Sequence, residues 1–196
     1  MTGKVRGEID MIESRIALLN LISFLLQYPD EEMLGRLDEL AAIADGVYPG
    51  ETRSVIQEFL KGLGRMTPIQ AQERYTAVFD MNPSTTLSVT YHAYGDNEKR
   101  AAALARLQHH YELAGWERIT GELPDYLPLM LEFLSICTSP EHTAPVWQCL
   151  KKMQPLIDGL KERAPGYADL LQTVCRMAVD GCATVGRDEM RNEAMA

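Results

Sequence analysis

The sequence lacks the features that mark several large protein classes. Its cysteines are few, Cys137, Cys149, Cys175 and Cys182, and they form no C-x-x-C pair and have no histidine at zinc-ligand spacing. No apolar run approaches the roughly 20 residues that span a bilayer, and the first residues are too polar for a signal peptide. We therefore predict a soluble, cytoplasmic protein with reduced thiols, no metal site and no stable membrane insertion.

Catalytic motifs are absent too. The chain has no GxSxG, Walker loop, GxGxxG or HExxH. His109 and His110 are helix neighbours that point to different faces, which makes a poor metal pair. His92 has no orienting acid or nucleophile at a motif spacing. These observations give no catalytic arrangement of usable specificity, and we expect no catalytic residues and no bound cofactor.

Positive charge is scarce. The 196 residues include 19 Lys and Arg against 28 Asp and Glu, which gives a net charge of −9. Such a balance disfavours nucleic acid as a partner, because no surface would neutralise phosphates. It suits a cationic partner, or serves solubility alone. With 46% hydrophobic and 24% charged residues, the composition is that of a globular domain with a real core.

Helical periodicity is what the chain has in abundance. Apolar residues recur every three or four positions in most of the sequence, and capping residues or prolines bound each stretch. We expect Asp30 and Thr67 to cap helices, Asp96 or Asn97 to cap another, and Pro155 to kink or split the helix that Pro145 starts. The expected helices cover about 9–28, 30–45, 55–64, 68–80, 97–114, 124–137 and 145–160, with a last one after Pro165-Gly166.

This pattern predicts an all-α fold, a single-domain bundle of about eight helices. No repeat, low-complexity tract or long polar linker divides the chain. We expect residues 1–185 to form the helical domain, and the polar residues 186–196 to be a disordered tail.

Residues 81–95 interrupt the helical rhythm. Leu87, Val89 and Tyr91 alternate as in a strand, but no partner strand is visible and one strand alone is not stable. We therefore expect an irregular loop or a single short turn, which presents Tyr91, His92 and Tyr94. Loops held by a rigid scaffold often carry function.

The segment 121–134, GELPDYLPLMLEFL, is the most distinctive stretch. Pro124 fits the first position of a helix, where its missing N–H costs nothing. Pro128 follows one turn later and cannot donate a hydrogen bond to the carbonyl four residues back, so the helix should tighten only after it. One apolar face of this helix carries Leu127, Leu131 and Leu134.

Acidic residues mark the start of the same helix. Asp125 and Glu132 share a second face, and Glu122 lies just upstream. An apolar helix whose first turn is incompletely hydrogen-bonded and flanked by acids can receive a peptide. It is equally consistent with an ordinary helix start and solvated carboxylates.

The stretch from Gln72 to Leu134 resembles the NarJ-type nitrate reductase molybdenum cofactor assembly chaperones, within the TorD/DmsD superfamily of redox-enzyme maturation proteins. The resemblance is carried by YHAYG at 91–95 and above all by ELPDYLPL at 122–129, followed by LEFL at 131–134. Leu25–Asp30 also looks like the end of the family's opening helix. Family members commonly have a histidine where this chain has Tyr126, which can still donate a hydrogen bond and offer a flat face.

The resemblance implies a TorD-like, all-helical chaperone that is not an enzyme. Such chaperones bind the N-terminal leader, or leader remnant, of an apo molybdoenzyme catalytic subunit. They hold it for molybdenum cofactor insertion before membrane docking or export. The implied partners are that apo catalytic subunit, above all of respiratory nitrate reductase, and proteins of molybdenum cofactor biosynthesis.

A helical, basic leader peptide would place its apolar face in a groove and its cations at carboxylates. We expect Glu122, Asp125 and Glu132 to meet the cations. The other residues expected at this peptide-binding site are Tyr91, His92, Tyr126, Pro128, Leu129 and Phe133.

Two other functions stay open. A delivery protein for the molybdopterin cofactor would bind that cofactor or a guanine nucleotide, although the sequence has no phosphate-binding loop. A small helical enzyme would use His92 with a nearby acid. The oligomeric state is open as well, because the linkers would allow helices to exchange between chains.

Overall fold

The computed structural model describes residues 2–48, 50–117 and 121–178, with side chains from residue 11 onward. The regular structure of the described part is helical and includes no β-strand, which confirms the all-α prediction. The predicted tail at 186–196 and the predicted domain end at residue 185 lie outside the described residues. The elements in chain order are α1 (Thr2–Leu25), α2 (Glu31–Gly35), α3 (Leu37–Val47), α4 (Gly50–Gly64), α5 (Pro68–Tyr75), the π-helical turn η1 (Thr76–Asp80), the 3-10 turn η2 (Pro83–Thr85), α6 (Val89–Tyr94), α7 (Glu98–Leu113), α8 (Leu127–Ile136), α9 (Pro140–Leu150), α10 (Gln154–Arg163) and the helical residues 165–178.

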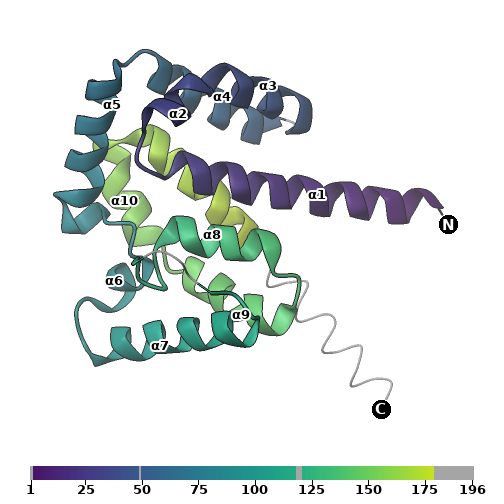
Figure 1. The fold of residues 1–196 in the computed structure, drawn as a ribbon, viewed down its shortest axis with the longest axis vertical. Coiled ribbons are helices and arrows are strands. Elements are labelled where there is room, and N and C mark those ends of the chain that lie inside the picture. The colour runs from purple at the N-terminus through teal and green to yellow at the C-terminus, as the bar shows by residue number, and fades with distance from the viewer. Residues whose placement is uncertain (1, 49, 118–120, 179–196) are drawn as a thin grey trace.

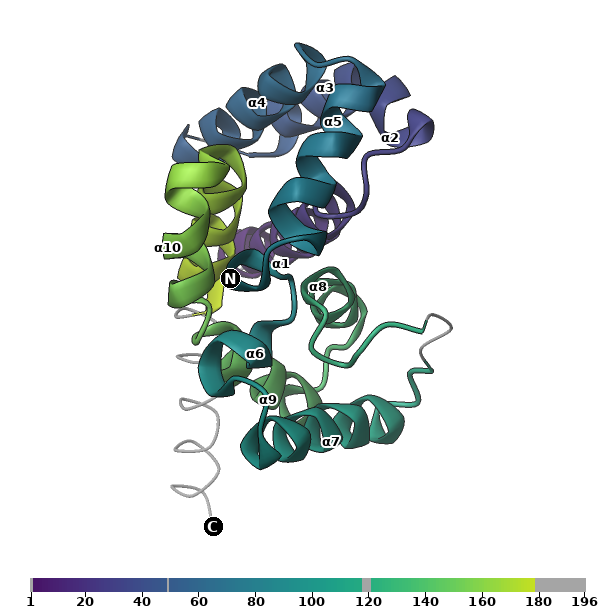
Figure 2. The same ribbon diagram turned by 90° about the vertical axis from the view of Figure 1, so that its left-hand side faces the viewer.

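Helix α8 crosses the middle of the molecule, with α1 packed along it (Figure 1). Helices α2–α5 lie on one side of this pair, and α6, α7 and α9 lie on the other (Figure 2). Helix α10 bridges the two groups through its contacts with η2 and α6. The core runs through all of these layers, and its fully buried side chains include Ile22, Leu25, Leu26, Met130, Leu131 and Leu150.

Local signals in the sequence fix several helix starts as predicted. The side chain of Asp30 accepts a hydrogen bond from the backbone N–H of Met33 at 2.8 Å. Thr67 and Gln70 form a reciprocal capping box at α5. Asn97, rather than Asp96, caps α7. These three starts are set by residues that are neighbours in the chain.

The described residues form more helices than expected, because two predicted helices are divided and α6 is an additional one. The helix expected over 30–45 breaks at Arg36, directly after Gly35, whose backbone freedom weakens a helix at that point. The helix expected from Pro145 begins earlier, at Pro140, and Pro145 lies inside α9. Pro155 lies in the first turn of α10, so the chain is split there rather than kinked.

The segment 81–95 has more regular structure than the irregular loop or single short turn that we expected. It contains the turn η2 and the six-residue helix α6, which ends at Gly95 with φ of 64°. Because α6 carries Tyr91, His92 and Tyr94, these side chains are placed by a helix. None of the described helices combines the length and the apolarity needed to cross a lipid bilayer.

Candidate functional site

The distinctive segment 121–134 starts its helix later than the first proline. Helix α8 begins at Leu127 with Tyr126 at the capping position, so the expectation that Pro124 opens the helix is wrong. Pro124 is instead buried in the preceding turn, and its carbonyl accepts a hydrogen bond from the hydroxyl of Tyr111 at 2.9 Å. That tertiary hydrogen bond holds the turn outside the helix. Pro128 takes the place in the first helical turn.

Asp125 points into the protein, and its side chain is 0% exposed. Its Oδ2 accepts hydrogen bonds from the N–H of Thr90 at 3.0 Å and from the Thr90 hydroxyl at 2.5 Å. The guanidinium of Arg100 approaches the same oxygen at 4.0 Å. We expected Asp125 to meet a peptide cation, but in this fold the carboxylate faces an internal arginine and a threonine. The carboxylate of Asp125 therefore does not lie on the surface.

The backbone around Asp125 joins two distant segments. Its carbonyl accepts from the N–H of Val89 at 3.0 Å, and the N–H of Leu127 donates to the carbonyl of Leu87 at 2.9 Å. An isolated antiparallel bridge between Ser88 and Tyr126 lies between these two hydrogen bonds. The start of α6 is therefore tied to the start of α8.

Three apolar residues expected at the peptide site are also buried. Phe133 is 0% exposed and packs its ring 4.6 Å from that of Tyr111 and 5.4 Å from that of Trp116, measured between centroids. Leu129 and Pro128 are buried as well. These side chains pack in the core because α8 is enclosed by α1 and its neighbours.

Tyr91 and His92 lie half-buried on α6. The guanidinium of Arg100 lies over the ring of Tyr91, 5.5 Å from its centroid. The Nε2 of His92 is 2.7 Å from the carbonyl oxygen of Thr86, so this nitrogen carries the proton and donates. Burial lowers the pKa of His92, and the hydrogen bond to Thr86 opposes that shift only in part.

Glu122 and Glu132 are exposed, and Tyr126 is half-buried. A shallow hollow of about 320 Å³ has Tyr91 and Arg100 in its wall, but none of the residues 121–134 line it. Of the nine residues predicted for peptide contact, five thus keep access to solvent. The buried four are Asp125, Pro128, Leu129 and Phe133.

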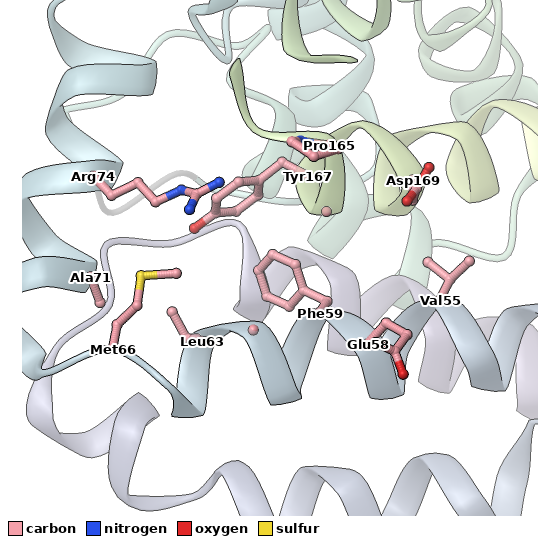
Figure 3. A pocket seen from close by; sticks show the side chains of 12 residues that line it. Val55, Glu58, Phe59, Leu63, Met66, Ala71, Arg74, Pro165, Tyr167 and Asp169 are labelled. Carbon is pink, nitrogen blue, oxygen red and sulfur yellow. The ribbon is translucent and has the colours of Figure 1, made fainter. Parts of the chain in front are cut away.

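A more apolar groove lies elsewhere, between α4, α5 and the helical residues 165–178 (Figure 3). Its volume is about 280 Å³, and Phe59, Leu63, Met66 and Tyr167 supply its apolar surface. The full lining is Val55, Glu58, Phe59, Gly62, Leu63, Met66, Ala71, Arg74, Pro165, Gly166, Tyr167 and Asp169. An open apolar groove between helices is a recurrent seat for a helical peptide.

Two glycines shape this groove. A Cβ atom added at Gly62 would meet no heavy atom within 4 Å, so this position leaves open space between the walls. A Cβ at Gly166 would lie 3.3 Å from the Phe59 ring, so the glycine lets the two helices approach closely. Tyr167 then packs its ring edge-on against Phe59, 4.9 Å between centroids.

Aromatic rings continue from the groove into the core. Phe79 lies 4.8 Å from Tyr167 and 4.8 Å from Tyr75, between ring centroids. Burial raises the pKa of Tyr167, against a smaller lowering by the nearby Arg74 guanidinium. The hydroxyl at the groove therefore stays protonated at neutral pH. The apolar wall of the groove is thus continuous with the aromatic packing of the core.

Sequence analysis did not identify this groove. Phe59 and Leu63 read as ordinary inward positions of a helix, and Arg74 and Tyr167 belong to no motif. The available signal was Gly62, a glycine inside a helical pattern, which often marks a close approach or a functional need. Within the described residues, no three His, Cys, Asp or Glu side chains gather as a metal-ion site would require.

Comparison with known proteins places this geometry in context. The family described as nitrate reductase delta subunit matches residues 47–164, which include the segment 121–134 and two of the three groove walls. The nitrate reductase molybdenum cofactor assembly chaperone NarJ of Escherichia coli K12 is 31% identical over 186 residues, covering 89% of this chain and 77% of the relative. A Bacillus subtilis protein provisionally assigned as the same chaperone is 31% identical over 153 residues, 78% of this chain and 83% of that one.

One solved structure has the same fold. It belongs to a candidate redox enzyme maturation protein from Archaeoglobus fulgidus, and it superposes with a TM-score of 0.59 over 83% of this chain and 92% of the other. The two chains are 24% identical, so the likeness concerns the fold alone.

Proposed function

The chain belongs to the nitrate reductase delta subunit family, and from this premise we propose that it is a maturation chaperone for an apo molybdoenzyme catalytic subunit. It binds the N-terminal leader or leader remnant of that subunit and holds the subunit until the molybdenum cofactor is inserted. The names of its relatives favour a nitrate reductase as the client, and we propose the respiratory enzyme. The chain acts in the cytoplasm, before the client docks on the membrane or is exported, together with proteins of cofactor biosynthesis.

The observation that carries this proposal is the apolar groove between α4, α5 and residues 165–178. Its floor suits the apolar face of an amphipathic helix, and charged side chains stand at its rims (Figure 3). A chaperone needs a surface that binds its client and does not need catalytic residues, and this groove meets that requirement. The net charge of −9 also favours encounter with a basic leader peptide.

The nine residues predicted for peptide contact receive two different roles in this proposal. The exposed Glu122 and Glu132, with the half-buried Tyr91, His92 and Tyr126, form an outer surface that contacts the client beyond the groove. The buried Asp125, Pro128, Leu129 and Phe133 act as positioning residues, because they fix α8 and α6 in the fold.

Calorimetric titration of the full chain tests the proposal. The probe is a synthetic peptide with the N-terminal sequence of the respiratory nitrate reductase catalytic subunit from the same organism. Gly62→Phe adds a ring to the groove lining at a position where a Cβ atom meets no heavy atom within 4 Å. Because glycine is a poor helix former, the fold should keep its stability. We expect this variant to weaken binding by at least about tenfold.

Gly46→Phe is the matched control, because Gly46 also lies in a helix with no heavy atom within 4 Å of an added Cβ. This variant should bind the peptide as the unmodified chain does. Thermal unfolding of both variants checks that the fold is kept. Equal affinities of the two variants would remove the groove from the proposal, and absence of any peptide binding to the unmodified chain would contradict the proposed function itself.

A further inference from the structure

The two ends of the groove carry opposite charges. Arg74 projects from α5 at one end, with its guanidinium beside the ring of Tyr167 (Figure 3). Glu58 from α4 and Asp169 from the 165–178 helix stand at the other end (Figure 3). The apolar floor separates the cation from the two acids. A ligand whose two ends differ in charge should therefore bind this groove with different affinities in its two possible directions.

The charged side chains are available to a ligand. Arg74 and Asp169 are exposed, and neither side chain has an ion pair or hydrogen bond within the part of the chain that the structure describes. Glu58 pairs with Lys61 at 3.0 Å, but these side chains are 71% and 57% exposed. An exposed pair of this kind contributes little and exchanges easily for another partner.

The groove has the length of a short helical segment. Val55 and Leu63 line it from the same helix, and eight steps of about 1.5 Å place them about 12 Å apart along the axis. A bound helix of about two turns therefore spans the distance between the acids and Arg74. Its apolar residues at positions three and four from the first charge would face the floor.

The dipole of a bound helix favours one direction of binding at both ends of the groove. A helix carries partial positive charge at its N-terminus and partial negative charge at its C-terminus. Placing the N-terminal end at Glu58 and Asp169 pairs positive with negative, and it brings the last carbonyl groups to Arg74. In the opposite direction, the negative C-terminal end of the helix would face Glu58 and Asp169, and its positive N-terminal end would face Arg74.

We propose that the groove binds the client's N-terminal segment preferentially in one direction, with its cationic N-terminal end at Glu58 and Asp169 and its C-terminal end at Arg74. This inference rests on the proposed function and adds a sequence rule to it. The segment that binds has a basic residue first, apolar residues three and four positions later, and an acidic residue or the helix end about seven positions later.

A pair of synthetic peptides tests the direction. Both have the same composition and the same apolar positions, but one has lysines in its first turn and glutamates in its last, and the other has these charges exchanged. In solution the helix dipole stabilises the second peptide as a helix, because its acids lie at the N-terminus. Tighter binding of the first peptide would therefore come from the groove and not from helicity.

We expect the lysine-first peptide to bind the full chain about fivefold more tightly than the exchanged peptide at low salt, with the difference shrinking as salt is added. The double variant Arg74→Glu with Asp169→Lys should invert that preference. Arg65→Glu with Asp38→Lys is the matched control, since both positions are exposed and line a different hollow. The control should leave the preference unchanged.

The outcomes separate this inference from the proposed function. Equal affinity for the two peptides, or preference for the exchanged peptide, would overturn the direction while the client's own N-terminal peptide still binds in a manner sensitive to Gly62→Phe. Loss of that sensitivity, or no binding of the client peptide, would instead overturn the proposed function, and the direction with it.

Discussion

The start of α8 and the groove beside α4 use similar residue types for opposite purposes. At the start of α8, Asp125 turns inward to Thr90 and Arg100 and is 0% exposed. At the groove, Asp169 and Arg74 stand exposed at the rims of an apolar floor. The comparison teaches that the stretch most distinctive in the sequence anchors the fold, while the surface that we propose for binding comes from residues without a motif.

The largest effect on stability is expected from a substitution in α8. Phe133→Ala removes a fully buried ring from between Tyr111 and Trp116, and it should lower the free energy of unfolding by about 4 kcal/mol. Urea denaturation measures this loss. Calorimetry on the protein that remains folded should give an unchanged peptide affinity. A stable variant with lost affinity would mean that Phe133 belongs to the binding surface.

Asp125→Ala tests the anchor itself. It leaves the N–H and hydroxyl of Thr90 without their acceptor and Arg100 without the buried carboxylate, so we expect a loss of about 3 kcal/mol in unfolding free energy. Chemical denaturation is again the measurement. Asp125→Asn keeps one acceptor oxygen and should lose less. An Ala variant as stable as the unmodified chain would show that Asp125 does not anchor α6 to α8.

Lowering the pH should reduce the free energy of unfolding, because the unfolded chain then binds more protons than the folded chain. Burial lowers the pKa of His92 and of His110, so near pH 6 the unfolded state binds more protons than the folded state. Stability from these groups is complete above their unfolded pKa of about 6.5 and falls as the pH drops below it. His92→Gln should make the pH dependence of urea midpoints shallower. An unchanged slope would contradict a neutral, buried His92.

The outer acids should give the smallest effect. Glu122→Gln with Glu132→Gln removes two exposed charges far from the groove floor, and the loss of peptide affinity should stay within about threefold because solvent screens such charges. Titration calorimetry at two salt concentrations measures it. A loss of tenfold or more would move the main binding site to the start of α8 and reverse the comparison.

The sequence predicts this fold well wherever the deciding residues are neighbours. The capping box of Thr67 with Gln70 and the cap at Asn97 are examples, since each involves partners within three positions. Helix α6 was missed because its first turn is held by Asp125, which lies 35 residues away from Thr90. No local pattern reports such a contact.

The groove could not be predicted either, because the residues that line it are distant from one another in the sequence. Gly62, Arg74 and Tyr167 come from three segments, and only the packing of α4, α5 and residues 165–178 brings them together. Asp125 was predicted to be accessible and is buried. Helical spacing assigns a residue to one face of a helix but does not say whether another element covers that face. Burial depends on what packs over a residue, and that is decided by the whole fold.

An NMR titration tests the central claim most directly. Backbone amide correlation spectra of the isotope-labelled full chain are recorded as the client's N-terminal peptide is added. The account predicts that the largest shifts fall on α4, α5 and residues 165–178, around Gly62, Arg74 and Tyr167, with smaller ones near Tyr126 and Glu132. Shifts confined to the start of α8 and to α6, with the groove unaffected, would contradict it.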